Sequence, residues 1–328
     1  MLYPFVFVPR LKPRLWGGRS LATLYGKSLP PGEPVGESWE ISDRPGDESL
    51  IANGPLAGRS LRWLIAEHGP ALLGAATAPQ GRFPLLVKIL DAREILSVQV
   101  HPPARLAAQL GGEPKSELWY VTQAAPGATL CAGLKEGVSR TEFEQRLQDG
   151  TVAECIHPVP VQAGDALFLP SGRIHALGTD LVIFEIQQNS DTTYRVFDWN
   201  RVGPDGHPRE LHLAQALACI DFDDFAPRPI QAAWQADGPV EQCSLLAHPL
   251  FSVTEHRATA ADGRLGSGER VAVVGVVSGA VQLDHPASGE SLVLKPGQFA
   301  LLPASAQPVA WSVTAASTWL VATPGTLP

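Results

Sequence analysis

Polar side chains of the kind that bind metal ions occur inside a stretch that otherwise predicts a buried strand. The stretch is LSVQVHPP, residues 96–103. Alternate side chains of a strand share a face, so Leu96, Val98 and Val100 fall on one side. The other side carries Ser97, Gln99 and His101. Because buried polar groups need partners, this face requires either ordinary hydrogen bonds or a metal ion.

Two further candidate ligands lie later in the chain. Glu117 belongs to the strand-like segment KSELWYV, and His175 lies just past a glycine-to-proline turn. Two histidines and one carboxylate leave a coordination position open, as catalytic zinc sites require. The same trio suits non-haem iron, so the residue types do not name the metal. Gln99 is the fourth candidate, and each side chain alone could be a hydrogen-bonded core residue.

Charged residues near these segments indicate an anionic, sugar-like ligand. Lys88 stands inside the apolar run LLVKIL, where its ammonium group must meet an anion or a cavity. The polar segment 186–201 carries Asp191 and Arg195, and arginine offers a fork of donors to phosphate or a developing oxyanion. Alternatively, Asp191 and Arg195 form a surface pair, and Lys115 is solvated.

The composition predicts a folded protein rich in turns. Of 328 residues, 45% are hydrophobic and 18% charged, with 31 glycines and 30 prolines. The net charge of −8 and the lack of a basic block argue against nucleic-acid binding. No apolar run is long enough to span a membrane, and no signal peptide is visible. The four cysteines lack CxxC spacing, which favours reduced thiols and a cytoplasmic location. No interface pattern is visible, so we expect a monomer.

The order of predicted elements is mostly strands with a few helices. Residues 1–58 contain many turn signals and are expected to be irregular. Helices are predicted at 60–74 with Ser60 as N-cap, at 103–112, at 139–150 with a capping box of Thr141 and Glu144, and at 209–222. Strands are predicted at 83–92, 95–100 and 116–124, and several more are predicted between 159 and 188.

A short internal sequence repeat predicts two copies of one barrel. Residues 163–177 resemble residues 296–310, with Gly164 and Pro170 matching Gly297 and Pro303. Each copy reads turn, strand, turn, strand, which is typical of a cupin-type double-stranded β-helix. We therefore expect a mainly β fold of two cupin-type barrels with a few helices inserted in and beside the first. His175 aligns with Pro308, so we expect a catalytic domain at 1–225 and a degenerate one without metal ligands at 226–328.

These segments, in order, resemble the motifs of the type I mannose-6-phosphate isomerase (phosphomannose isomerase) family in its short bacterial form. The motifs are FPLLVKILDA, LSVQVHPP, KSELWYV, GRIHALG and QNSDTTYRVFDW. The resemblance implies a zinc enzyme that interconverts mannose 6-phosphate and fructose 6-phosphate. It implies zinc ligation by His101, Glu117 and His175, with Gln99 either a fourth ligand or a neighbour of the ligands.

The resemblance also implies roles for the charged residues. Arg195 matches the catalytic arginine and Asp191 the acidic residue before it. Substrate contacts are implied for Lys88, Lys115 and Ser97, to which we add Glu185 as a second candidate for the base. Longer members of the family have a histidine where this chain has Pro114, so another group must carry any proton which that histidine transfers.

Other functions remain open at this point. A cupin oxygenase could use iron at the same three ligands, although the lysines and the arginine suit a phosphate better. A non-catalytic sugar-binding cupin would need no turnover. An isomerase for another epimeric sugar phosphate differs only in side-chain placement.

Overall fold

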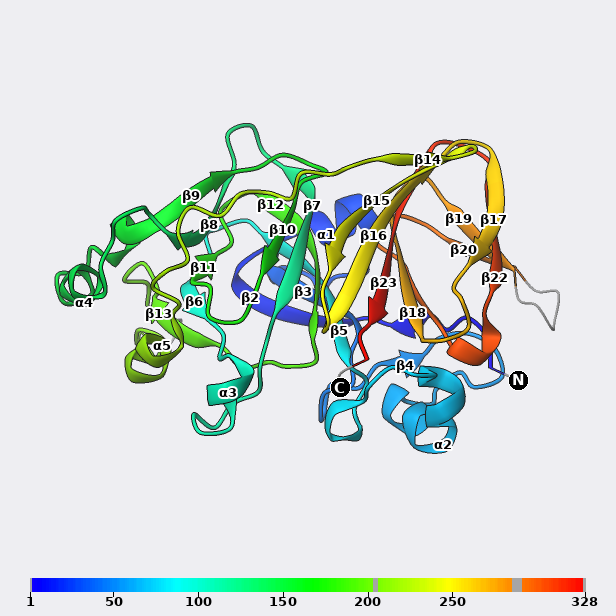
Figure 1. The fold of residues 1–328 in the computed structure, drawn as a ribbon, viewed down its shortest axis with the longest axis horizontal. Coiled ribbons are helices and arrows are strands. Elements are labelled where there is room, and N and C mark those ends of the chain that lie inside the picture. Colours follow the sequence, from blue (N-terminus) through cyan, green and yellow to red (C-terminus); the bar gives the residue numbers. More distant parts are fainter. Residues whose placement is uncertain (1, 203–205, 285–290, 327–328) are drawn as a thin grey trace.

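The structure is a computed structural model that describes residues 2–202, 206–284 and 291–326. It is mainly β, with antiparallel sheets arranged as two lobes side by side (Figure 1). The first lobe contains a six-stranded sheet of β10 (Ala166–Leu169), β7 (Glu117–Ala124), β12 (Leu181–Gln188), β5 (Leu85–Ala92), β2 (Arg10–Gly18) and β3 (Val35–Ile41). Facing it is a five-stranded sheet of β13 (Tyr194–Phe197), β6 (Val98–Val100), β11 (His175–Ala176), β8 (Thr129–Leu134) and β9 (Ile156–Pro160).

The second lobe repeats this arrangement. Its six-stranded sheet consists of β14 (Gln235–Asp237), β15 (Val240–Ala247), β16 (Phe251–Ala258), β23 (Ser317–Pro324), β18 (Ala272–Ser278) and β21 (Phe299–Leu302). Its four-stranded sheet consists of β17 (Ala261–Leu265), β22 (Val309–Val313), β19 (Val281–Asp284) and β20 (Ser291–Leu294). A small pair, β1 (Phe7–Val8) and β4 (Leu50–Ile51), stands apart.

The strands from β5 to β12 and those from β16 to β23 pair in the same order. β12 lies between β5 and β7, as β23 lies between β16 and β18. β11 lies between β6 and β8, as β22 lies between β17 and β19. The glycines of the repeat, Gly164 and Gly297, turn into β10 and β21 with φ of 94° and 73°. The predicted fold of two related barrels is confirmed, while the division at residue 225 stays a prediction.

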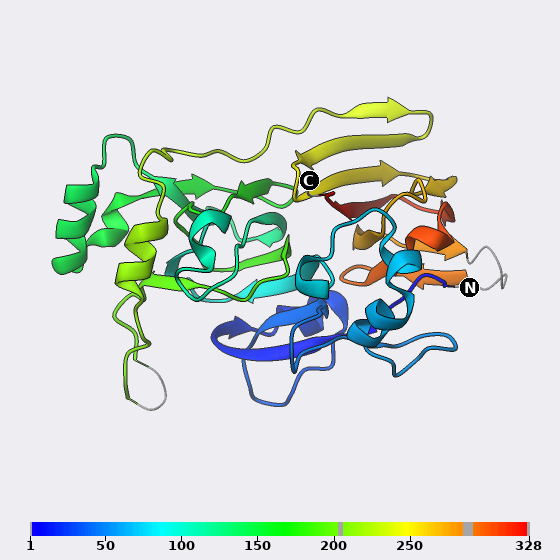
Figure 2. The ribbon, with the colours of Figure 1, turned by 60° about the horizontal axis from the view of Figure 1, so that its bottom comes forward.

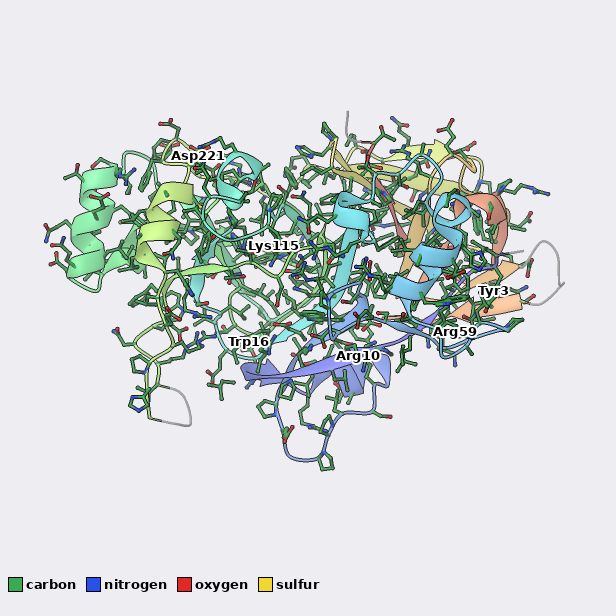
Figure 3. All side chains as sticks on the ribbon, turned by 90° about the horizontal axis from the view of Figure 1, so that it is seen from below. Tyr3, Arg10, Trp16, Arg59, Lys115 and Asp221 are labelled. Atoms are coloured by element: carbon green, nitrogen blue, oxygen red, sulfur yellow. The ribbon has the colours of Figure 1, made fainter. Side chains whose placement is uncertain are left out.

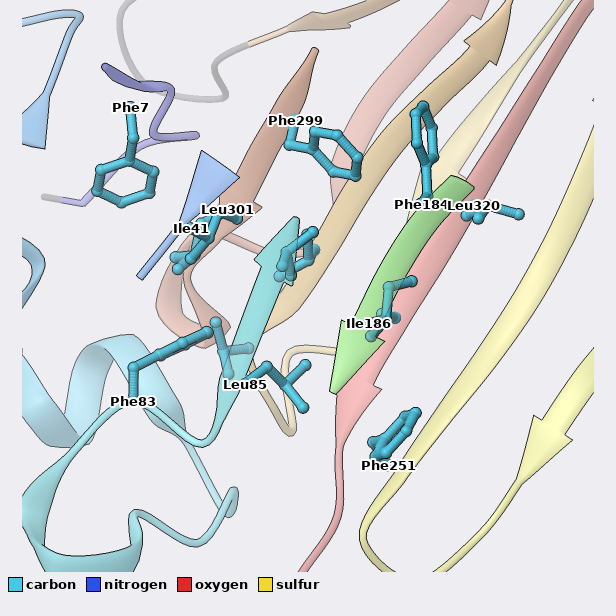
Figure 4. Packing of buried hydrophobic residues seen from close by; sticks show 14 of the residues in the cluster. Phe7, Ile41, Phe83, Leu85, Phe184, Ile186, Phe251, Phe299, Leu301 and Leu320 are labelled. Atoms are coloured by element: carbon cyan, nitrogen blue, oxygen red, sulfur yellow. The ribbon is translucent and has the colours of Figure 1, made fainter. Parts of the chain in front are cut away.

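The large sheet of the first lobe is buried on both faces. Alternate residues along its strands face either the apolar core or the interior of the first barrel, where the candidate site lies. On β12, Phe184 and Ile186 join the core that continues into the second lobe, where Phe184 meets Phe299 at 4.9 Å between ring centroids (Figure 4). Glu185 and Gln187 alternate with them and therefore face the interior of the first barrel. The same alternation on β7 sends Leu118 and Tyr120 to the shared core and Glu117 to the interior.

Five α-helices and three 3₁₀ turns accompany the sheets in the described residues (Figure 2). They are α1 (Ser20–Tyr25), α2 (Leu61–Leu73), α3 (Ala104–Ala107), α4 (Arg140–Gln148), α5 (Leu213–Cys219), η1 (Pro79–Gly81), η2 (Val152–Cys155) and η3 (Ala304–Ala306). Ser60 caps α2, as predicted. The capping box of Thr141 and Glu144 is wrong, because Ser139 caps α4 by accepting the backbone N–H of Glu142.

The expectation of an irregular segment at 1–58 is also wrong. This segment supplies β1 to β4 and α1, and β2 and β3 extend the large sheet of the first lobe. Pro13 and the Gly17–Gly18 pair interrupt the alternation that would have marked β2 as a strand. Gly17 is required there, since a Cβ would lie 2.3 Å from the backbone nitrogen of Gly36.

The strand predicted at 95–100 begins later than expected. β6 starts at Val98, and Val98 and Val100 pack in one apolar cluster against α5. Leu96 joins a different cluster with Trp16, so it does not share their face. Gln99 faces the opposite side, as the alternation predicted, and this side is the interior of the first barrel.

Candidate metal centre

The structure brings His101, Glu117 and His175 together inside the first barrel. Glu117 opens β7, His175 opens β11, and His101 directly follows β6. One ligand atom from each residue lies within 4.8 Å of the others, and all three side chains are buried. Oε1 of Glu117 lies 3.3 Å from Nε2 of His175, and Oε2 lies 3.5 Å from Nε2 of His101. Three residues that are distant in the sequence therefore converge on one point.

Backbone carbonyls determine which nitrogen of each histidine faces that point. Nδ1 of His101 lies 2.9 Å from the carbonyl oxygen of Thr192, and Nδ1 of His175 lies 2.9 Å from that of Arg173. A carbonyl oxygen only accepts, so each Nδ1 must carry the proton. Nε2 of each ring then faces the carboxylate of Glu117. This is the arrangement that metal-binding histidines adopt in proteins.

The electrostatics of the cluster favour the ligating forms. Burial, and then the charge of Lys115, lower the pKa of His101 to about 3. Burial alone would raise the pKa of Glu117, but Lys115 and His101 hold it well below its usual range. Nε2 of His101 and both carboxylate oxygens of Glu117 are buried without a hydrogen-bond partner. A divalent cation would satisfy these atoms, so the residues present fit a metal ion.

Gln99 lies at the edge of this cluster. Its side-chain Nε2 is 3.2 Å from Nε2 of His175, and Gln99 pairs with His175 across β6 and β11. In this orientation the amide presents a donor to the nitrogen lone pair. Rotation of the amide by a half turn would present Oε1, which is the atom that could bind a metal.

A row of side chains crosses the large sheet beside the cluster. Trp39, Lys88, Glu185 and Trp119 are register partners on four neighbouring strands. Nζ of Lys88 lies 2.9 Å from Oε2 of Glu185, whose Oε1 accepts from the indole of Trp119 at 3.0 Å. Burial opposes the charge on Lys88, yet Glu185, Glu37 and Asp191 together raise its pKa. The predicted burial of Lys88 with an anion is therefore present, and the anion is Glu185.

Sequence reasoning missed three residues of this region because segment 1–58 was expected to be irregular. Glu37 accepts two hydrogen bonds from Arg14, at 2.8 and 3.2 Å, and one from the indole of Trp39 at 2.7 Å. The ring of Trp39 lies 5.2 Å from the ammonium group of Lys88. The strand-like alternation in VGESWEI was the signal that could have identified this segment.

The other predicted substrate residues lie near the metal cluster in different settings. Lys115 is 4% exposed, and its Nζ lies 3.3 Å from Oε2 of Glu117, so it is not solvated. Figure 3 shows Lys115 near the middle of the molecule, among the side chains of the first lobe. Ser97 is buried just before β6.

Arg195 and Asp191 do not pair with each other among the described residues. Arg195 is the register partner of Gln99 on β13, so its side chain lies on the same face as the amide of Gln99. It donates from Nη1 to the carbonyl oxygen of Glu210 at 2.7 Å, while its buried Nε has no hydrogen-bond partner. Burial and the nearby Arg209 lower the pKa of Arg195. Asp191 is exposed in the loop between β12 and β13.

The second barrel has apolar residues where the first has ligands. Glu117 pairs with Leu169 of β10, and at the equivalent pair of the second lobe Ala272 faces Leu302. The buried residues of β22 are Val309, Trp311 and Val313, which join an apolar cluster. Within the described residues, His101, Glu117 and His175 are the group found to be arranged for a metal ion. The interior of the second barrel is thus lined mainly by apolar side chains, and His256 stacks there against Trp319.

None of the helices described is both long and apolar enough to cross a lipid bilayer.

Fold and site together define a class: a double β-barrel protein with a candidate metal centre in its first barrel. Comparison with known proteins narrows this class. Residues 5–126 match the family described as phosphomannose isomerase type I, catalytic domain. The chain is 38% identical over 254 residues to the mannose-6-phosphate isomerase of Streptococcus mutans, covering 77% of this chain and 78% of that one.

Solved structures agree with the sequence comparison. The mannose 6-phosphate isomerase of Bacillus subtilis superimposes with a TM-score of 0.87 at 30% identity, covering 98% of this chain and 99% of that one. A zinc-bound mannose 6-phosphate isomerase superimposes with a TM-score of 0.76 at 19% identity, over 98% and 99% of the two chains, and shows the shared fold. The chain belongs to the type I mannose-6-phosphate isomerase family, in its short bacterial form. The resemblance predicted from the motifs is confirmed.

Proposed function

We propose that this chain interconverts mannose 6-phosphate and fructose 6-phosphate with one zinc ion held by His101, Glu117 and His175. The single observation that carries the proposal is the set of buried ligand atoms on His101 and Glu117 that have no hydrogen bond, inside a barrel that also holds buried lysines. The names of the relatives support the substrate, and the zinc bound in an isomerase of the same fold supports the metal.

The reaction moves hydrogen between C1 and C2 of the open-chain sugar through a cis-enediol. A bound zinc ion would supply Lewis-acid polarisation of the sugar oxygens. The protein contributes two imidazoles whose orientation is fixed by Thr192 and Arg173, and the anionic carboxylate of Glu117. The ligand cluster thus needs little rearrangement to receive the ion, which favours binding of the metal.

The cationic side chains around the cluster would bind the substrate's charge. Lys115 lies next to Glu117, and Arg195 projects on the same face as Gln99. The unpartnered Nε of Arg195 remains available for a substrate oxygen. We assign Lys88, Lys115 and Ser97 to substrate binding, and Arg195 to stabilising charge that develops on the sugar.

Asp191 is the better of the two candidates for proton transfer. The carboxylate of Glu185 is already engaged by the ammonium group of Lys88 and the indole of Trp119. Both of its oxygens are therefore occupied by protein groups. Asp191 is exposed on the loop that leads to Arg195, and its charge acts on Lys88. Glu185 would then act by holding Lys88 in place for the substrate.

A coupled assay for fructose 6-phosphate formation tests the proposal. We expect turnover of mannose 6-phosphate, its loss after chelation, and its return with stoichiometric zinc. Oxygen uptake that depends on iron would instead identify a cupin oxygenase. Sugar-phosphate binding without turnover at any metal loading would identify a non-catalytic cupin. Turnover that is faster with another epimeric sugar phosphate would correct the substrate while leaving the reaction class unchanged.

A further inference from the structure

Each histidine of the metal centre is held by the carbonyl of a residue that is itself fixed outside the centre. His101 donates to the carbonyl of Thr192, and His175 donates to the carbonyl of Arg173. We infer that two separate clamps, one built on Glu113 and one on Asp224, orient the two histidines and thereby set the affinity for the metal. The inference rests on the metal centre of the proposed function and assigns new positioning residues to it.

The first clamp ties the loop of Thr192 to the segment before β7. Oγ1 of Thr192 accepts the backbone N–H of Glu113 at 3.0 Å, and its own backbone N–H donates to Oγ of Ser190 at 3.2 Å. The hydroxyl of Ser190 donates in turn to the carbonyl of Glu113 at 3.1 Å. The two segments also pack closely, because a Cβ on Gly112 would lie 2.6 Å from Cγ2 of Thr192.

The carboxylate of Glu113 anchors this clamp to two arginines. Arg44 and Arg82 both form ion pairs with it, one on each oxygen. Arg44 also donates to the carbonyl of Asn189 at 3.0 Å, so it holds the loop directly as well. Burial opposes the charge of Glu113, but Arg82 and Arg44 lower its pKa and keep it anionic. The position of the Thr192 carbonyl is thus determined by charges outside the barrel.

The second clamp holds Arg173 through its side chain. The guanidinium group donates from Nε and Nη2 to the two oxygens of Asp224, each at 2.7 Å, and from Nη1 to the carbonyl of Phe168 at 2.7 Å. Asp224 is itself bound to β8, since its carbonyl accepts the backbone N–H of Leu134 at 2.9 Å. Bidentate pairing of this kind has a defined geometry and fixes the position of Arg173. The carbonyl of Arg173 is thereby held where it accepts the Nδ1 proton of His175.

The two clamps share no residue, so each can be tested against the other. Loss of the partner that fixes a metal-bound histidine typically lowers metal affinity about 10-fold to 100-fold. Thr192→Val removes the hydroxyl that accepts from Glu113 but keeps the carbonyl that meets His101. Thr192→Ser retains the hydroxyl and is the matched control. Asp224→Asn breaks the bidentate pair and leaves Thr192 untouched.

Two measurements separate positioning from general structure. The first is the zinc dissociation constant, determined by competition with a chelator of known affinity. The second is the tautomer of each histidine in the zinc-free protein at neutral pH, determined from ring ¹⁵N shifts. This second readout requires neither zinc nor turnover, so it can fail or succeed independently of the proposed isomerase activity.

We expect Thr192→Val to weaken zinc binding about 10-fold and to give a mixed tautomer at His101 while His175 stays protonated on Nδ1. Asp224→Asn should also weaken zinc binding, but give a mixed tautomer at His175 while His101 stays protonated on Nδ1. Thr192→Ser should match the wild type. Should Thr192→Val not fold, Glu113→Gln tests the same clamp. Unchanged zinc affinity with a single His101 tautomer would overturn the inference. Equal changes at both histidines in either variant would also overturn it, since the clamps would then not be separate.

Discussion

The ammonium group of Lys88 lies 2.9 Å from Oε2 of Glu185, and the two side chains are only 5% and 4% exposed. Removal of one partner from a buried pair leaves the other charge without compensation and costs about 3–5 kcal/mol. We therefore expect Lys88→Met to lower the free energy of unfolding by about that amount, measured by urea denaturation. The double variant Lys88→Met/Glu185→Gln should recover most of the loss, because no unpaired charge remains.

An exposed ion pair provides the control for this experiment. Arg140 and Glu144 pair on the surface of α4 with side chains 56% and 40% exposed, so Arg140→Ala should change stability by less than about 1 kcal/mol. If the double variant were as unstable as Lys88→Met, the cost would come from lost packing and not from the unpaired carboxylate.

The ligand set itself is tested by removing one imidazole. His101→Ala takes away one of the three ligands, so we expect both the bound zinc and the turnover to disappear. Metal content after dialysis and the coupled isomerase assay measure the two effects. His157→Ala, on β9 and outside the cluster, should retain zinc and activity. A zinc-free His101→Ala protein with wild-type turnover would contradict the role of the metal.

The sequence was most informative where a polar residue interrupts a strand that is buried on both faces. Lys88 within LLVKIL and Glu117 before LWYV are costly in such positions unless they serve a site, and the structure brings both to the interior of the first barrel. The presence of two related barrels was predictable for a related reason. The turns at Gly164 and Gly297 have positive φ angles, which favour glycine, so the repeated turn is visible in the sequence.

What the sequence could not show depends on the backbone or on an interrupted pattern. The carbonyls of Thr192 and Arg173 orient the histidines, and any residue type supplies a carbonyl. Glu37 and Trp39 reach Lys88 only because β3 pairs with β5, a pairing far apart in the sequence. The strand β2 was hidden by Pro13 and by glycines that allow β2 and β3 to approach closely. Long-range pairing of this kind leaves no local signal.

The second barrel offers a test of stability against pH. His256 on β16 stacks against Trp319 with an interplanar angle of 7°, and burial lowers the pKa of His256 to about 4. Between pH 6.5 and about 4 the unfolded chain therefore binds a proton at this residue that the folded chain does not. The free energy of unfolding must therefore fall as the pH falls through this range. At pH 5 the titration of His256 lowers it by up to about 2 kcal/mol.

Replacement of His256 by phenylalanine should remove this pH-dependent loss of stability while keeping an aromatic ring against Trp319. Urea unfolding at pH 7 and pH 5 measures the effect, and we expect the wild type to lose more stability than His256→Phe over this interval. Histidines elsewhere contribute equally to both proteins and cancel in the difference. Parallel losses in the two proteins would show that His256 titrates in the folded state as it does in the unfolded chain.

Substitution of Arg195 should affect catalysis without affecting metal binding. Its side chain lies on the face of Gln99 and donates to the carbonyl of Glu210. Among the described residues, it forms no hydrogen bond or ion pair with His101, Glu117 or His175. Arg195→Ala should therefore keep zinc at the wild-type level and lower kcat by roughly 100-fold or more, as the loss of a charge-stabilising donor typically does. Metal analysis and steady-state kinetics on the same preparation provide the two measurements.

Arg195→Lys sharpens this test because it keeps the charge and removes the planar fork of donors. If the fork orients the sugar, the lysine variant should remain far below the wild type in kcat, since a point charge cannot replace two directed hydrogen bonds. Arg201→Lys, the same change at a neighbouring arginine that pairs with Asp198, gives the effect of losing a guanidinium fork nearby while Arg195 is intact. Full activity in Arg195→Lys would reduce the role of Arg195 to its charge, and full activity in Arg195→Ala would remove it from the catalytic site.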